Sequence, residues 1–459
     1  MEATLKVIMQ KSEDGGAEPG SEQPAMVAGG ADKRWPRRRL LRWALGLVPV
    51  AAGGGWAALD WLGEREASAG DERPSQRTTW MCLAGHRGAY VELDNWLQPP
   101  IRKPNAPARL MRACLYLEHG SLDAMQRDLM WPEVTHTPEA RLLLELTERR
   151  SQSMDWRHAF FESWDALGRP DFSKSTLLPE PLEDAHVLVF INDEQPLQGL
   201  PLLTVIPGQE GFLEWGPGQV RASDSVPLLM ALRERLLVLE ELSPARQQLL
   251  PLAEERLDQL TGSAPPTLQL ALRAFLAERP PEALFQRRDL EALEPLVTLA
   301  WKQTASEHFF QQMHESLKDM LLLPGHHAFL LATWAQGVSL GQELQRRARA
   351  SAAHLDEDDR HWLGRLLWEV GARLREQHSR LELERGLLLQ VYGSELTGHS
   401  PTRMESIDLW VELGRWEEAL KRSGFKRWPL ASLHEEACGP RARDEHAWLQ
   451  AFAGKAALP

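Results

Sequence analysis

The stretch LWVELGRWEEALKRSG, residues Leu409–Gly424, guides the interpretation of the whole chain. Its apolar residues recur every three or four positions, which is typical of one face of an amphipathic helix. Within this pattern, Trp416 follows Gly414 by two positions, and Ala419 follows three positions later. Glycine accepts the backbone angles of a turn, and alanine takes little room between two helices. The stretch therefore predicts a tight contact between helices.

The same helical periodicity continues through most of the chain. TPEARLLLELTERR begins with Thr137 as a cap and Pro138 at the first helical position. HWLGRLLWEVGARL carries an apolar stripe at helical spacing, formed by Leu363, Leu367, Val370 and Leu374. We therefore expect a mainly α body made of a helical segment at 106–182 and a helical-repeat-like domain at 223–459, arranged as an α-hairpin array or solenoid.

Residues 183–222 interrupt this pattern with a segment rich in Val, Ile, Leu, Gly and Pro. The runs HVLVFI and LLTVI are short, apolar and bounded by turn residues, which is typical of strands, and GFLEWGPG is a third candidate. The segment therefore predicts a small β-like insertion between the helical parts. An extended loop packed on the helices is the alternative interpretation, and both remain open.

The opening stretch resembles one tetratricopeptide hairpin over Leu409–Leu420. The second half of that motif has a glycine, an aromatic residue, an alanine and an apolar residue at the spacing of Gly414, Trp416, Ala419 and Leu420. The resemblance implies that Gly414 lies at the turn and that Trp416 packs into the hairpin. It also implies an apolar face on the preceding helix, formed by Ile407, Trp410 and Val411.

Two other stretches match this motif less well. LYLEHGSLDAMQRDL places Gly120, Leu122 and Met125 at the same offsets, with Met125 in the place of alanine. FLAERPPEALFQRR keeps the final pair of the motif, Ala283 and Leu284, without the glycine or the aromatic residue. The 34-residue period of the family does not emerge across the chain. A generic α-solenoid or helical bundle is therefore the alternative to true repeats.

The N-terminal part reads as a membrane-targeting region. A tail at 1–32 without apolar periodicity precedes a basic collar at 33–43, which holds six Lys and Arg side chains. The nineteen residues at 44–62 are apolar except for Asp60, long enough to cross a bilayer. An acidic stretch opens the linker at 63–105. Positive charge before the span places the N-terminus in the cytoplasm and the body in the periplasm of a bacterium.

Other interpretations of this region stay open. Ala67-Ser68-Ala69 has the small residues of a signal cleavage site, so the chain is alternatively exported and cleaved near Ala69. Arg37–Arg42 resembles the twin-arginine export signal. A buried helix of a soluble protein is a third interpretation, which the three consecutive glycines of the span disfavour.

Composition restricts the partners. The formal net charge is −13, and an acidic body repels phosphate backbones, so we expect no nucleic acid. The 18 Trp residues fill helix interfaces or, alternatively, stack on sugar rings. The three cysteines, Cys82, Cys114 and Cys438, are too few for a disulfide framework, and one bridge or three free thiols are both compatible with the sequence.

No catalytic, cofactor-binding or metal-binding residues are predicted, because the sequence shows no phosphate loop, nucleophile elbow or zinc motif. His434 and Cys438 lie four residues apart but lack a third ligand, so we expect a surface histidine and a buried cysteine. His326-His327 are expected in a turn, and His308 and His314 on the surface. The acidic run Asp356–Asp359 is expected to open a helix.

Two classes of function remain. The first is a membrane-anchored, non-enzymatic interaction or scaffold protein that binds a protein partner with its helical body. The second is an exported all-helical carbohydrate-binding or carbohydrate-active protein that uses Trp stacking and Asp or Glu acids. Trp residues gathered in one cleft beside two carboxylates would favour the second class, and Trp residues dispersed through helix interfaces favour the first.

The topology is testable with a reporter that is active only outside the cytoplasm. Fused after Pro459, it should be active in a bacterial host, because the basic collar stays in the cytoplasm. Replacing Arg37 and Arg38 by Lys should leave export unchanged if 44–62 is a signal anchor. Loss of export in that variant would instead assign the twin-arginine route, and an inactive reporter in the unmodified fusion would reverse the orientation.

Overall fold

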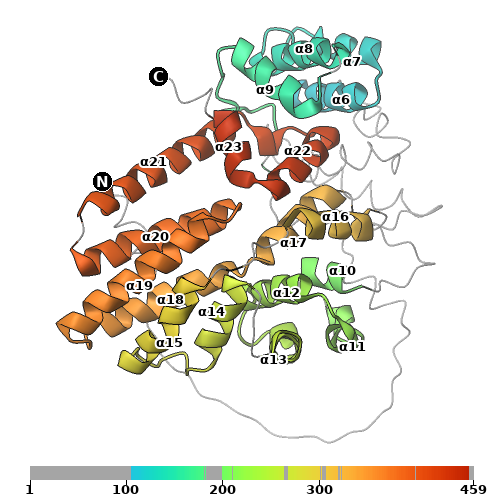
Figure 1. The fold of residues 1–459 in the computed structure, drawn as a ribbon. Coiled ribbons are helices and arrows are strands. Elements are labelled where there is room, and N and C mark those ends of the chain that lie inside the picture. The colour runs from blue at the N-terminus through green and yellow to red at the C-terminus, as the bar shows by residue number, and fades with distance from the viewer. Residues whose placement is uncertain are drawn as a thin grey trace, which may run out of the picture. The chain divides into compact units, whose positions relative to one another are not determined.

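The computed structural model describes residues 105–453 apart from 153, 180, 182–198, 209, 263–266, 300, 302–305, 319–320, 322 and 399. This part of the chain is mainly α-helical and contains no β-strand (Figure 1), so the predicted mainly α fold is confirmed. Within it, no helix combines the length and the apolar character that crossing a membrane requires. The predicted tail, collar, span and linker lie outside the described residues, as does Cys82, except that Asn105 at the end of the linker caps the first described helix.

The elements follow one another as helices of one to six turns. The first group is α6 (Ala106–Glu118), α7 (Leu122–Leu129), α8 (Pro138–Ser151), α9 (Trp156–Ala166) and η2 (Phe172–Lys174). The middle group is α10 (Leu200–Val205), η3 (Glu210–Phe212), α11 (Gly216–Ala222), α12 (Val226–Val238), α13 (Pro244–Thr261), α14 (Leu268–Ala277), α15 (Arg287–Thr298), α16 (Ser306–Leu317), α17 (Pro324–Trp334), α18 (Val338–Ala352), α19 (Glu357–Arg375) and α20 (Arg380–Thr397). The last group is α21 (Ser400–Arg422), η4 (Phe425–Arg427), α22 (Ala431–Arg443) and α23 (Glu445–Ala453).

Several helices begin where the sequence predicts. Thr137 Oγ1 accepts from Ala140 N at 3.2 Å at the start of α8, with Pro138 in the first turn. The acidic run opens α19, where the Asp356 carboxylate accepts from Asp359 N at 2.8 Å. Satisfied amide groups and negative charge near the positive end of the helix dipole both stabilise these starts.

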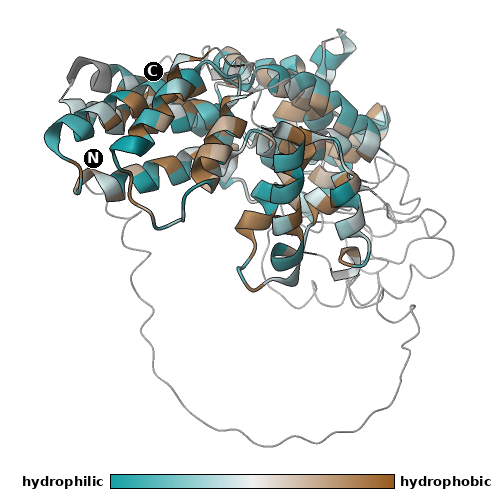
Figure 2. Cartoon of the chain, turned by 60° about the horizontal axis from the view of Figure 1, so that its bottom comes forward, coloured by the Kyte–Doolittle hydropathy of each residue, from teal (hydrophilic) through white to brown (hydrophobic). Residues whose placement is uncertain are grey.

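Two apolar cores hold the helices together. One is built from the middle group, from Leu200 to Leu389, with contributions from Cys438 and Ala442. The other joins the first group to the last, since Leu110–Leu178 pack with Leu383–Leu449. Figure 2 shows hydrophobic and hydrophilic residues interspersed along the helices, and the buried hydrophobic ones form the two cores. Four pairs of successive helices pack closely, namely α6 with α7, α12 with α13, α16 with α17 and α19 with α20, and α22 packs against α9.

The β-like insertion is wrong where the structure describes it. LLTVI lies mostly in α10, and GFLEWGPG enters η3 and α11. Pro201 in the first turn favours the helix, and Thr204 Oγ1 donates back to Leu200 O at 2.7 Å. A run this short has no readable period, and the burial of Leu202, Leu203 and Val205 decides its conformation. HVLVFI lies outside the described residues.

The hairpin predicted around Gly414 is also wrong. All of Leu409–Leu420 lies within the continuous helix α21, and Gly414 is exposed. Trp416 is buried, as expected, but it packs between helices that are distant in sequence. The weaker match does form a turn between two helices, because Gly120 has a φ of 70° between α6 and α7. Only glycine adopts that conformation without strain.

The closest helix contact joins α19 to α20. A Cβ atom on Gly371 would lie 2.5 Å from Gly386 O, and one on Gly393 would lie 2.4 Å from Gly364 O. The glycines are seven residues apart in each helix, so the same edge faces the partner twice. The two backbones therefore touch, in an antiparallel pair that forms the side-by-side helices α19 and α20 of Figure 1.

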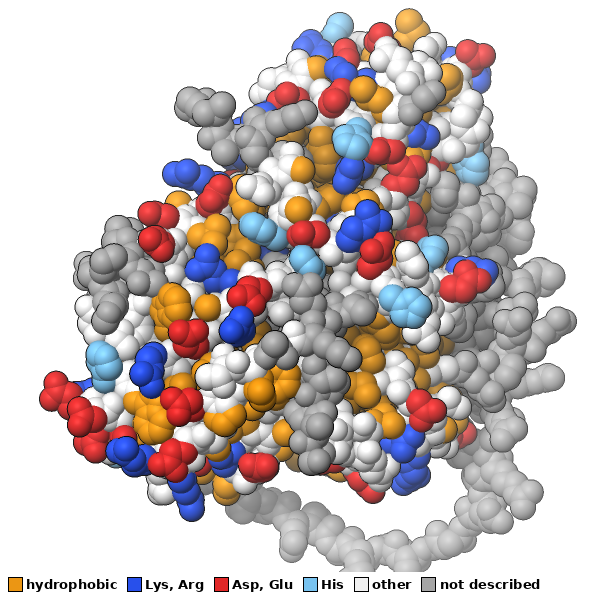
Figure 3. All heavy atoms as spheres, viewed as in Figure 1, with side chains coloured by type: hydrophobic (Ala, Val, Ile, Leu, Met, Phe, Trp, Pro, Cys, Tyr) orange, Lys and Arg blue, Asp and Glu red, His pale blue; other side chains and the backbone are white. Residues whose placement is uncertain are grey.

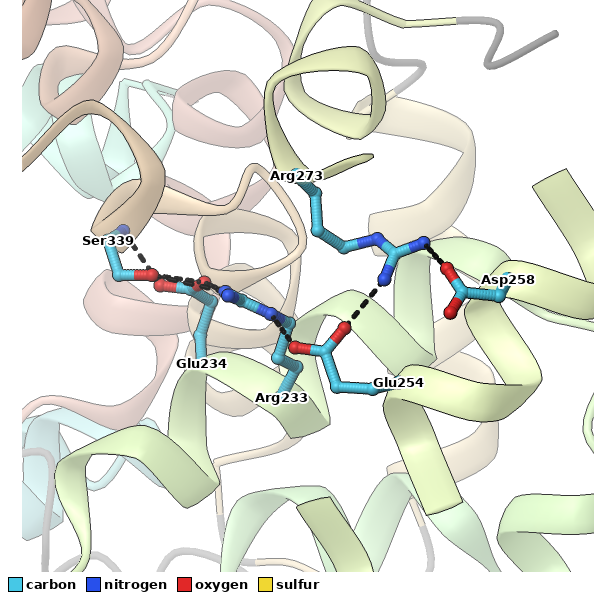
Figure 4. Close-up of polar contacts among 6 residues, drawn as sticks. All are labelled: Arg233, Glu234, Glu254, Asp258, Arg273 and Ser339. Atoms are coloured by element: carbon cyan, nitrogen blue, oxygen red, sulfur yellow. Dashed lines mark hydrogen bonds and ion pairs between the residues drawn. The ribbon is translucent and has the colours of Figure 1, made fainter. Parts of the chain in front are cut away.

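Glutamates join helices that are far apart in sequence. Glu234 of α12 accepts from Ser339 N and Oγ, both at 2.8 Å, and so caps α18 (Figure 4). In the same network, Glu254 of α13 binds Arg233 and Arg273, each at 2.6 Å. At other amino ends, Glu435 accepts from Gly325 N at 2.9 Å on α17, and Glu445 accepts from Arg380 N at 3.2 Å on α20.

The glycine contact is testable by adding one methyl group. Gly393→Ala should lower the free energy of unfolding by about 1–3 kcal/mol, because the new Cβ meets backbone that must move. Thermal and urea unfolding of the purified protein measure the change. Gly414→Ala is the matched control, since nothing lies within 4 Å of its Cβ. That control should stabilise α21 by about 0.5–1 kcal/mol. Equal stability of the two variants would contradict the contact.

Candidate functional site

The candidate site is a surface cleft between α9, the loop that follows it, and α23. Its free volume is about 100 Å³. Phe161, Trp164 and Trp448 form an aromatic floor, and charged side chains surround it. The charged residues are Arg157, His158, Glu162, Asp165 and Arg169.

α22 holds α9 in place beside the cleft. Glu436 of α22 accepts from Trp156 N at 2.7 Å, at the first residue of α9. The start of α22 is held in turn by Glu118 of α6, which accepts from Ser432 N at 3.0 Å. A charged acceptor at a helix start satisfies a free amide and stabilises the dipole. The position of the cleft therefore depends on helices from both ends of the described chain.

The loop after α9 is organised by one arginine. The Arg427 side chain is buried, and all of its guanidinium N–H groups point at backbone carbonyls. Nε, Nη1 and Nη2 donate at 2.7–2.8 Å to the carbonyl oxygens of Phe172, Ser173, Ser175, Leu178 and Pro179. Arginine has five donors in a rigid fork, so one side chain satisfies a loop without regular hydrogen bonding.

A left-handed turn shapes one edge of the cleft. Gly168 and Arg169 have φ values of 75° and 59°. This conformation is strained for arginine, and it turns the side chain back along the helix. Arg169 Nε then donates to Asp165 at 2.6 Å, and the guanidinium lies 5.9 Å from the centre of the Trp164 ring.

The carboxylates at the rim already have cationic partners. Asp165 binds Arg169, and Glu162 binds Arg149 at 3.1 Å. Asp155, just before α9, holds the ring of His158 at 2.5 Å. Burial opposes ionisation of Asp155, but hydrogen bonds from the His158 backbone and ring outweigh it, so the pKa of Asp155 lies below its usual value.

Arg157 contributes positive charge to this rim. Its Nη2 lies 3.1 Å from the His158 ring, and it forms no ion pair with any carboxylate among the described residues. Tryptophan faces are not accessible here, because Trp164 and Trp448 are only 3% and 5% exposed. The cleft therefore offers a small apolar centre bordered by mixed charge, including an arginine that forms no ion pair with a described residue.

The cysteine and histidine pair of the sequence lies away from this cleft surface. Cys438 is buried, as expected, and its thiol donates to His434 O at 3.0 Å. His434 is also buried, so its expected surface position is wrong. Its Nε2 lies 2.8 Å from Trp428 O, and burial lowers its pKa to about 4. Cys114 and Cys438 are not bridged to each other.

The other histidine groups considered in the sequence lie on helices α16 and α17. Across the described ranges, no three His, Cys, Asp or Glu residues are grouped so that they can hold a metal ion. His326-His327 lie in the first turn of α17 instead of in a turn between helices, and His327 is buried. His308 is exposed, as expected, and His314 lies 3.4 Å from Glu435.

A small buried pocket lies beside the α19–α20 pair. Glu382 is buried there, with Ser379 Oγ at 2.8 Å and Gln269 Nε2 as its other partner. Burial raises the pKa of Glu382 to about 8. The free volume of about 10 Å³ is about the least that admits one water molecule. The pocket therefore holds a carboxylic acid that is largely protonated at neutral pH.

No protein-family model, curated protein or solved structure matches this chain. The tetratricopeptide resemblance therefore rests on the residues alone, and its best match, Leu409–Leu420, lies within a single helix.

The sequence did not point to the cleft. DWRHAFFESWDALGR contains aromatic residues and charges at helical spacing, which also describes an ordinary buried helix. The one local signal is the combination of Phe161 and Trp164 with charges at 157, 158, 162 and 165 on one helix. The other wall, α23, is almost three hundred residues away, and periodicity does not show that pairing.

Glu382 makes stability depend on pH. Its folded pKa of about 8 exceeds the unfolded value of 4.5, so the folded state holds a proton that the unfolded state releases between these values. The stability it contributes is therefore complete below about pH 4.5 and falls as the pH rises to about 8, by at most about 1.4 kcal/mol per pH unit.

Glu382→Gln should remove this loss, because an amide resembles the protonated acid in shape and hydrogen bonding. Urea unfolding at several pH values between about 5 and 8 measures it. The variant should gain stability over the parent as the pH rises. Glu395→Gln, an exposed change on the same helix, should keep the parental pH dependence. Parallel curves for parent and Glu382→Gln would refute the buried acid.

Proposed function

We propose that this chain is a membrane-anchored, non-enzymatic interaction protein that binds a protein partner outside the cytoplasm. Residues 44–62 serve as the anchor, with the N-terminus in the cytoplasm and the body in the periplasm. The body is a solenoid-like array of α-hairpins. The close pairing of α6 with α7, α12 with α13, α16 with α17 and α19 with α20 supports this array, and the cleft between α9 and α23 carries the proposal of partner binding.

The cleft has the composition of a protein-binding hot spot. Such sites combine aromatic side chains and arginine at an apolar centre with a polar rim that excludes water. Phe161 and Trp448 line the centre, and Arg157 supplies a cation that forms no ion pair with a described carboxylate. A partner that inserts an apolar side chain and places a carboxylate near Arg157 fits this arrangement.

The charge distribution on the surface shown in Figure 3 also supports a protein partner. Figure 3 shows charged side chains of both signs scattered over one face, with apolar groups exposed between them. Mixed charge of this kind suits contacts with proteins better than binding to a polyanion. The acidic net charge also disfavours binding to nucleic acid, which is therefore not proposed as a partner.

The carbohydrate alternative requires exposed Trp faces beside two carboxylates. Among the described Trp residues only Trp410 is exposed, and it lies on α21 away from the cleft lining. The cleft carboxylates Glu162 and Asp165 are bound to arginines. Trp residues dispersed through helix interfaces favour the interaction protein over a sugar-stacking platform.

The proposal is testable by quantitative affinity capture from membranes. Tagged full-length protein, solubilised with detergent after brief cross-linking, should retain one or more protein partners. Arg157→Glu should reduce capture of those partners several-fold, because it reverses the charge at the rim. Arg365→Glu, an exposed change on α19, is the matched control and should capture as the parent does.

Two results would count against this function. Partners captured equally by the parent, Arg157→Glu and the control would exclude the cleft as their binding site. Recovery of the protein from the soluble fraction, with no partner enriched over an untagged strain, would exclude a membrane-anchored interaction protein. Circular dichroism and thermal unfolding should first show that both variants fold as the parent.

A further inference from the structure

A buried histidine lies behind the aromatic floor of the cleft. His434 of α22 is 5% exposed, and its ring meets the Phe425 ring edge to face, with 5.3 Å between the ring centroids. Phe425 in turn contacts two rings of the floor, stacked on Phe161 at 5.9 Å and edge to face with Trp448 at 6.1 Å. One aromatic ring therefore separates the imidazole of His434 from the cleft.

The same imidazole also binds the segment that carries Phe425. His434 Nε2 lies 2.8 Å from Trp428 O, so the neutral ring donates from Nε2 to the residue that ends η4. η4 contains Arg427, whose guanidinium binds the loop after α9. Both the floor of the cleft and the loop at its edge therefore depend on η4, and His434 joins η4 to α22.

The surroundings of His434 oppose a positive charge on its ring. Burial is the main reason that the pKa of His434 lies at about 4, below its usual 6.5. Like charge comes from His326 of α17, Lys426 of η4 and Arg441 of α22 itself, and it acts in the same direction. The carbonyl of Trp428 acts in the opposite direction, but burial outweighs it.

The carboxylates of the helices around His434 have other partners. On α22, Glu435 lies 3.4 Å from His314 of α16, and Glu436 accepts from the first amide group of α9. Glu445 of α23 binds a guanidinium of α22. The charged side chains of α9 border the cleft. A proton on the buried ring is therefore not balanced by these carboxylates.

We propose that His434 is a pH switch for the partner-binding cleft, which opens when the imidazole takes up a second proton. This inference rests on the proposed function, because it concerns the regulation of the same cleft. The charged ring leaves its buried site, η4 separates from α22, and Phe425 no longer supports the floor. A partner bound to the closed cleft at neutral pH is then released in acid.

The closed cleft is favoured at neutral pH and loses stability as the pH falls. In the closed state the ring takes up its proton at about pH 4, whereas a solvated ring does so near pH 6.5. The stability of the closed state is therefore complete above about pH 6.5 and decreases from there toward pH 4. Between pH 7 and pH 5 the ratio of closed to open molecules should fall roughly twentyfold.

Hydrogen exchange followed by mass spectrometry tests the switch without a partner. In the full-length protein, amide groups of α9, η4 and α23 should lose protection up to roughly twentyfold from pH 7 to pH 5, after correction for the intrinsic exchange rate. Helices α12 and α13, which belong to the other core, should keep their protection.

His434→Gln should remove the effect of pH. The glutamine amide can donate to Trp428 O and does not titrate, so protection of α9, η4 and α23 should be equal at pH 7 and pH 5. His308→Gln, an exposed change on α16, is the matched control and should lose protection in acid as the parent does.

Partner capture at two pH values gives a separate readout. Partners whose capture at pH 7 depends on Arg157 should be retained several-fold less by the parent at pH 5, and equally at both pH values by His434→Gln. Hydrogen exchange decides the switch even where no partner is captured, so failure of the proposed function is distinguishable from failure of the switch.

Three results would overturn the switch. The first is equal protection of α9, η4 and α23 at both pH values in the parent. The second is a loss of protection in acid that includes α12 and α13, which would mean global unfolding. The third is an acid effect in His434→Gln as large as in the parent. If His434→Gln does not fold at pH 7, histidine NMR of the parent decides, because a His434 signal that titrates at the ordinary value of about 6.5 would also exclude the switch.

Discussion

Glutamate side chains that cross between helices hold this fold together. A helix start leaves amide groups without partners, and a carboxylate satisfies them and balances the dipole. Here the carboxylates come from helices distant in sequence, as Glu436 does for α9 and Glu435 for α17. Because these two residues are adjacent on α22, one helix fixes the starting points of two others. The excess of acidic residues is thus partly a structural requirement.

Local sequence patterns correctly predicted where several helices begin. Thr137 and Asp356 begin helices as predicted, because a cap depends on residues three positions away. The prediction of a turn at Gly414 was wrong because a turn depends on more than its local motif. A glycine inside a strongly amphipathic segment marks a turn only if the chain on both sides can pack as separate helices. The neighbouring Leu413 and Trp416 are buried on one straight face, which favours a continuous helix.

The candidate site could not be predicted from local sequence patterns. Its walls, α9 and α23, meet only because the second core brings the two ends of the described chain together. The buried states of His434 and Glu382 depend on the same long-range packing, and a pattern of residue types does not report burial. The glycines of α19 and α20 were more accessible to sequence reasoning, since two pairs at a spacing of seven on neighbouring helices are typical of a close helix contact.

The guanidinium of Arg427 sets an order of events during synthesis. The carbonyl group of Phe172 accepts a hydrogen bond from Arg427, which is synthesised 255 residues later. At translation speeds of roughly 5–20 residues per second, that delay is about 10–50 seconds. Until then, the loop after α9 and the apolar faces of the first helices lack their partners. A nascent chain therefore exposes these carbonyl groups for most of its synthesis, and a product truncated before Arg427 would lack the donors for all five of them.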